Sequence, residues 1–76
     1  MVKKKFTWQF NGYDSLKIAE HQMNHLKEFF EREKIEIFDI GTKNINEFVS
    51  ISFVIADEKF EEIIKNSLKP HLVSKY

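Results

Sequence analysis

The chain has 76 residues, no cysteine, and twelve basic residues balanced by twelve acidic ones. A chain of this length suits a single domain spanning residues 1–76, and the lack of cysteine excludes a disulfide framework, a thiolate nucleophile and a cysteine-based zinc site. The net charge of zero argues against general affinity for nucleic acid or for anionic membranes.

The first half of the chain predicts a strand followed by a long helix. Phe6, Trp8 and Phe10 alternate with polar residues, so residues 3–10 are expected to form a strand with one buried face. Asn11-Gly12 predicts a turn. A helix is expected from about residue 15 to residue 33, because apolar residues recur there at helical spacing. They are Leu16, Ala19, Met23, Leu26 and Phe30, with Ile18 and Phe29 widening one side.

The second half predicts two strands, a second helix and a short last strand. Residues 35–40 are expected to form a strand, 41–46 a loop, and 48–56 a strand of strict alternation. Asp57 can cap a helix that runs to about residue 68, and Pro70 ends it. Residues 71–76 are a possible fourth strand.

The order β-α-β-β-α-β predicts an α+β fold of the ferredoxin-like, split βαβ plan. In that plan an antiparallel sheet of order 4-1-3-2 carries two helices on one face. The first and third strands, which alternate most cleanly, would be central. Many functions occur on this plan, so function must be argued from a site.

The alternation also predicts which side chains lie on the sheet face without helices. If Phe6 and Trp8 face the helices together with Val49, Ile51, Phe53 and Ile55, the intervening residues of both strands point the other way. The second strand leaves three alternatives: Ile35 and Ile37 inward, Phe38 and Ile40 inward, or a bulge that changes the register midway. Both regular alternatives leave two large apolar residues outward, which is typical of an interaction site. The expected partner-binding residues are Lys5, Thr7, Phe38, Ile40, Phe48, Ser50, Ser52 and Val54.

A nucleic-acid site is the alternative interpretation. The last strand should run antiparallel to the first and bring Lys75 toward the lysines at the start of the chain. The resulting basic pole, with an aromatic residue for base stacking, would consist of Lys3, Lys4, Lys5, Lys75 and Phe48. The Lys/Arg-Gly-aromatic signature of RNA-binding domains with this topology is absent from the sequence.

Metal binding and catalysis have weaker support. His21 and His25 are spaced to share one helix face, but the sequence places no convincing third ligand beside them. No phosphate-binding loop or nucleophile motif occurs. We therefore expect no metal, no cofactor and no enzymatic activity.

The sequence thus favours a small non-enzymatic protein-interaction module, such as a regulatory subunit or a phage-type inhibitor, that binds a partner protein or itself through the open sheet face or an edge strand. A homo-oligomer is expected. No apolar run approaches the roughly 18 residues of a membrane span, and no signal peptide follows Met1, so a cytoplasmic location without membrane contact is expected. The abundance of Lys, Ile, Phe and Asn suggests AT-rich codons and hence a low-GC bacterium or one of its phages.

Overall fold

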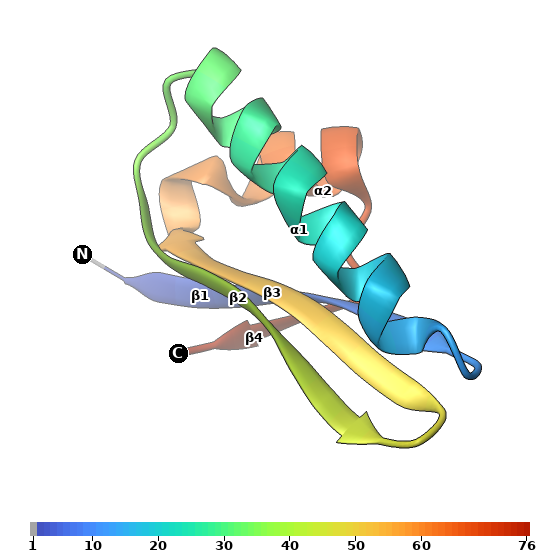
Figure 1. Cartoon of the computed structure of the whole chain (residues 1–76). Coiled ribbons are helices and arrows are strands. Elements are labelled where there is room, and N and C mark those ends of the chain that lie inside the picture. The colour runs from blue at the N-terminus through green and yellow to red at the C-terminus, as the bar shows by residue number, and fades with distance from the viewer. Residues whose placement is uncertain (1) are drawn as a thin grey trace.

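The computed structural model describes residues 2–76 as a four-stranded antiparallel sheet with two helices on one of its faces (Figure 1). We call the side covered by the helices the helix face and the other side the open face. The elements in chain order are β1 (Lys3–Asn11), α1 (Ser15–Arg32), β2 (Ile37–Asn46), β3 (Val49–Asp57), the 3-10 turn η1 (Glu58–Phe60), α2 (Glu61–Leu68) and β4 (Leu72–Lys75).

The strands lie in the order β2-β3-β1-β4, which is 4-1-3-2 when counted from the β4 edge. All neighbouring strands are antiparallel. The two strands with the cleanest alternation, β1 and β3, are therefore central, as the sequence predicted. The two edges differ: β4 has four residues, whereas β2 has ten.

The predicted loop at residues 41–46 is wrong, because β2 continues through it to Asn46 and reverses in a two-residue turn at Glu47 and Phe48. β2 pairs with β3 from Ile37 to Asn46, with register shifts between Ile37 and Asp39 and between Asn44 and Asn46. Backbone pairing with a buried central strand holds this polar segment extended, although its side chains alone suggested a loop.

The core lies between the helix face and the two helices. Its fully buried large side chains come from every layer: Phe6 and Val54 from the sheet, Leu26 from α1 and Ile64 from α2. Each such burial contributes about 1.5–3 kcal/mol relative to an exposed side chain. The remaining core residues are Trp8, Phe30, Ile35 and Ala56, with Ile37 and Ile40 of β2 packed against them.

Small residues let the first half of α1 lie close to β3. Ser15 and Ala19 on the helix are buried, as are Ser50 and Ser52 on the strand. The hydroxyls of Ser15 and Ser50 are 3.0 Å apart, and Asn44 Nδ2 donates to Ser50 Oγ over 2.9 Å. The Ser52 hydroxyl has no hydrogen-bond partner within residues 2–76. The larger residues predicted for this stripe, Leu16 and Ile18, are instead exposed.

Specific polar contacts hold both ends of the segment that connects β3 to β4 through α2. Asp57 Oδ1 accepts from the Lys59 amide over 3.0 Å, so the predicted cap is present, although the first turn it caps is a 3-10 turn. At the other end, Lys69 is left-handed with φ 48°, which stops α2 just before Pro70. The Trp8 indole donates to the Leu68 carbonyl over 2.7 Å and ties this helix end to β1.

His71 immediately precedes the fourth strand. Its amide donates to the Thr7 carbonyl over 2.9 Å, and its Nδ1 accepts from the Gln9 amide over 2.8 Å. The backbone and side chain of His71 thus extend the pairing with β1 by one residue before the start of β4. The predicted fourth strand is confirmed at Leu72–Lys75.

Candidate binding face

The open face carries an apolar row along the central strand β3. Phe6 pairs with Val54 and Trp8 pairs with Ser52, and directly paired residues of an antiparallel ladder point to the same side. Because Phe6 and Trp8 lie in the core under the helices, Val54 and Ser52 lie there too. The alternate residues of β3 are therefore on the open face: Val49, Ile51, Phe53 and Ile55.

This arrangement reverses the predicted faces of β3. Ser50, Ser52 and Val54 were expected on the binding surface, and all three are buried on the helix face. The mistake came from assuming that the more apolar side of the strand must face the helices. The helix face of β3 is instead built from small residues, because α1 packs against it closely.

The second strand takes the alternative with a bulge. In a regular strand, Ile37 and Ile40 would point to opposite faces of the sheet because they are three residues apart. The register shift between Ile37 and Asp39 lets both side chains pack against the core. Ile40 is therefore not on the predicted binding surface. Phe38, within the shift, is 48% exposed, and the Lys3 ammonium lies 4.5 Å from its ring centre.

Phe53 occupies the middle of the open face. Its ring lies against Gly41 of the neighbouring strand, and a Cβ atom at Gly41 would come within 3.1 Å of Phe53 Cζ. The Lys5 ammonium lies 4.9 Å from the centre of the same ring. A glycine in the edge strand thus makes room for an aromatic ring of the central strand, a pairing known to compensate for glycine in sheets.

Of the predicted residues, Lys5, Thr7 and Phe38 lie on the open face. Lys5 pairs with Ile55 and Thr7 with Phe53. Phe48 does not: it lies in the turn between β2 and β3, where its ring packs edge-on against Tyr13 with centroids 4.8 Å apart.

The predicted basic pole is divided between the two faces. Lys3 and Lys5 alternate with Lys4 along β1, so they point to the open face while Lys4 points to the helix face. Lys75 pairs directly with Lys4 and shares its side. The four lysines therefore do not form one surface with Phe48.

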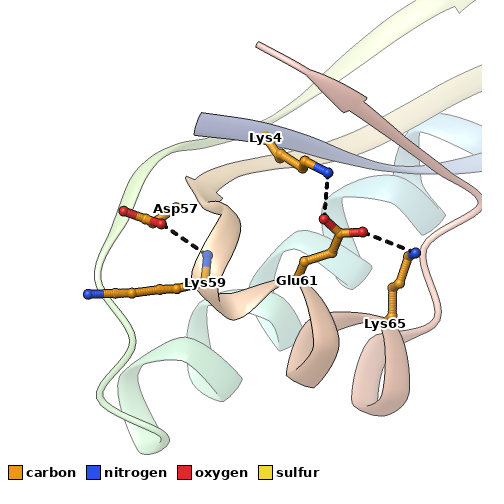
Figure 2. A network of polar contacts seen from close by, with 5 residues as sticks. All are labelled: Lys4, Asp57, Lys59, Glu61 and Lys65. Carbon is orange, nitrogen blue, oxygen red and sulfur yellow. Dashed lines mark hydrogen bonds and ion pairs between the residues drawn. The ribbon is translucent and has the colours of Figure 1, made fainter. Parts of the chain in front are cut away.

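Lys4 belongs to a network of ion pairs at the start of α2 (Figure 2). Its ammonium contacts Glu61 Oε1 at 2.6 Å, and the Lys65 ammonium contacts Glu61 Oε2 at 3.0 Å. The hydrogen bond from Lys4, followed by that from Lys65, lowers the pKa of Glu61 below its ordinary value of 4.5. The hydrogen bond to Glu61 raises the pKa of Lys4 above 10.5. The network joins β1 to α2, so its role is structural.

The network predicts acid-sensitive stability. A carboxyl whose pKa is lower in the folded state than in the unfolded state stabilises the fold. This stabilisation is complete when the pH is above the unfolded-state pKa, and it is lost as the pH falls through the folded-state pKa. We expect Glu61→Gln to lower the melting temperature at pH 7, and the gap to wild type to shrink as pH drops below about 4.5. Glu62→Gln, at an exposed neighbouring position of α2, is the matched control and should change little. A gap that stays constant from pH 7 to pH 2 would contradict this role of Glu61.

The histidine pair is present on the exposed side of α1. The Nε2 atoms of His21 and His25 are 3.0 Å apart, and His25 Nδ1 is 3.9 Å from Glu28 Oε2. Within residues 2–76 no group of three or more His, Cys, Asp or Glu side chains could hold a metal ion. His71 is held at β1 and does not join the pair.

Comparison with protein-family models, with curated proteins and with solved structures finds no match for this chain. Over residues 2–76, no helix is long and apolar enough to cross a membrane. The function must therefore be argued from the open face itself.

Proposed function

We propose that this chain is a small, non-enzymatic interaction module of the ferredoxin-like class that binds a partner protein through its open face. The observation that carries this proposal is the pair of half-buried side chains Ile51 and Phe53 on the side of the sheet opposite both helices, next to Ile55, which is itself buried. Apolar rows bordered by polar residues are typical of protein-binding surfaces.

The border of the row has the composition that such surfaces use. Lys5 flanks it on β1, beside the buried Thr7, and the exposed Asp39 and Lys43 flank it on β2. At the rim, Phe38 and Leu72 add exposed apolar side chains at 48% and 59% exposure. An apolar centre within a polar rim excludes water from the centre while the charged groups set the orientation of the partner.

Two isoleucine variants test the proposal. Ile51→Glu places a charge in the middle of the open face, whereas Ile18→Glu places the same charge on exposed α1, on the other side of the sheet. In nuclease-treated lysate, we expect tagged wild-type and Ile18→Glu protein to capture the same partner and Ile51→Glu to lose at least nine-tenths of it. Equal capture by both variants would reject the open face.

Nucleic-acid binding is the second candidate, favoured by one observation: each phenylalanine of the open face lies beneath a lysine ammonium, Phe53 under Lys5 and Phe38 under Lys3. A base could stack on such a ring while the lysine contacts phosphate. Only two lysines are placed in this way, so the expected salt slope for single strands is shallow, about 0.7 per phosphate.

Fluorescence anisotropy with single-stranded RNA separates the two candidates. Phe53→Leu keeps an apolar side chain over Gly41 but removes the aromatic face. If RNA is the partner, this variant should lose about 1–3 kcal/mol of binding free energy independently of salt. Weak binding that vanishes near physiological salt and ignores Phe53→Leu would leave the protein-interaction proposal ahead.

A further inference from the structure

The free edge of β2 has a defined set of backbone groups that point away from the sheet. In an antiparallel ladder, alternate residues direct their N–H and C=O groups to opposite neighbours. The Thr7 carbonyl and the Gln9 amide of β1 form hydrogen bonds with His71 on the β4 side. The backbone N–H and C=O groups of Phe6 and Trp8 therefore point toward β3.

The same alternation fixes the next two strands. The backbone groups of Val54 and Ser52 point toward β1, because these residues pair with Phe6 and Trp8. The backbone groups of Phe53 and Ile55 therefore point toward β2. Their partners on β2, Gly41 and Asp39, bond toward β3. Ile40 and Thr42 therefore direct their backbone groups to the free edge. The Ile40 amide agrees with this assignment, because it donates to the Asp39 carboxylate, over 2.9 Å.

The segment between the two register shifts of β2 is regular. It runs from Asp39 to Asn44, and its open-face side chains are Asp39, Gly41 and Lys43. The charges are thus placed symmetrically about the glycine, acid on one side and base on the other. A strand with this pattern is complementary to a second copy of itself in antiparallel orientation.

We propose that two copies of this chain pair through the free edges of β2, with the two-fold axis at Gly41, so that Asp39 of each copy lies opposite Lys43 of the other. In this register Ile40 lies opposite Thr42 of the second copy, and each such pair exchanges both of its N–H···O bonds. The Asp39 carboxylate, released from the Ile40 amide, then faces the lysine of the second copy on the open face.

The centre of the paired edge also fits. Gly41 would meet Gly41 of the second copy at a close, non-hydrogen-bonded position where side chains of opposite strands crowd. Each glycine is covered by its own Phe53 ring, so the two rings meet above the two-fold axis. The result is one eight-stranded sheet with a continuous open face.

The neighbouring register lacks these features. With the axis at Thr42, Gly41 would face Lys43 of the second copy, and Asp39 would face Ile45, so neither charge would find an opposite one. The two register shifts that flank the segment bend the strand at both ends and limit the pairing to this short length. A limited interface of this kind predicts a reversible dimer.

Charge exchange tests the proposal. Wild-type protein should shift from the 9.1 kDa monomer toward twice that mass in sedimentation equilibrium between about 10 µM and 1 mM. Asp39→Lys alone should place like charges opposite each other and weaken the dimer at least tenfold, and Lys43→Asp alone should do the same. An equimolar mixture of the two variants should regain the dimer as a heterodimer, because every facing pair is again opposite in charge.

The contrary outcomes are equally specific. A monomer throughout the concentration range, or a dimer that neither variant weakens, would overturn the proposal, as would a mixture that does not regain the dimer. Binding of a different protein at this edge, with no dimer of this chain, would also overturn the proposal. Circular dichroism verifies that both variants are folded. The proposal concerns the edge and not the face, so its failure leaves the Ile51→Glu result unaffected.

Discussion

Val54→Asp should unfold the domain, whereas Phe53→Asp should leave it folded. Val54 is fully buried on the helix face between the sheet and the helices, so an aspartate there would be a buried charge. Burial of an unpaired carboxylate costs several kcal/mol. A domain of this size has roughly 0.05–0.15 kcal/mol of stability per residue, which such a cost consumes largely or entirely.

Phe53 lies on the open face, where solvent reaches an introduced carboxylate. The Lys5 ammonium, now 4.9 Å from the ring centre, would be close to the new charge. We expect Phe53→Asp to lose about 2–3 kcal/mol from the partly buried ring, while its far-ultraviolet circular dichroism at 20 °C matches that of wild type. Urea titrations of both variants measure the difference. If Phe53→Asp unfolds and Val54→Asp does not, the faces of β3 assigned above are wrong.

The alternation of the sequence predicted the strands but not the faces of β3. A period of two identifies the two sides of a strand, yet the side that meets the helices depends on which residues pair across to β1. The pairing of Phe6 with Val54 is a long-range property that no local pattern contains. Hydrophobicity pointed the wrong way, because the buried side of β3 uses Ser50 and Ser52 to admit α1.

The candidate site was therefore only partly predictable. Lys5, Thr7 and Phe38 lie where the sequence placed them, while Phe53 was assigned to the core. A local signal did exist for its true position: Gly41 stands in a polar stretch, and a glycine inside an edge strand calls for a large neighbour to cover it. The polar composition of the stretch predicts a loop, and that prediction hides the signal from Gly41.

Gly41 connects the two proposals. Its missing side chain leaves room for the end of the Phe53 ring on the open face, and in the proposed dimer it also lets two β2 edges approach at the two-fold axis. A face that binds a partner and an edge that doubles this face would give the module two copies of one binding surface. Two linked sites raise the apparent affinity for a partner that is itself repeated.

Trp8→Ala should produce the largest loss of stability from a simple truncation. Trp8 is 3% exposed in the core, and its indole N–H donates to the Leu68 carbonyl at the end of α2. Truncation of a buried aromatic side chain to alanine costs about 3–5 kcal/mol through lost burial and the cavity left behind. It also leaves the Leu68 carbonyl without its donor.

Trp8→Phe separates the two contributions, because it retains most of the buried ring and removes the N–H donor. We expect this variant to lose about 1–3 kcal/mol, clearly less than Trp8→Ala. Phe38→Ala, at an aromatic residue that is 48% exposed, serves as the control and should stay within about 1 kcal/mol of wild type. Trp8 is the sole tryptophan, so urea unfolding must be followed by circular dichroism rather than by indole fluorescence. A loss below about 1 kcal/mol for Trp8→Ala would mean that the indole does not connect β1 to the end of α2, and that this end of the core is packed differently.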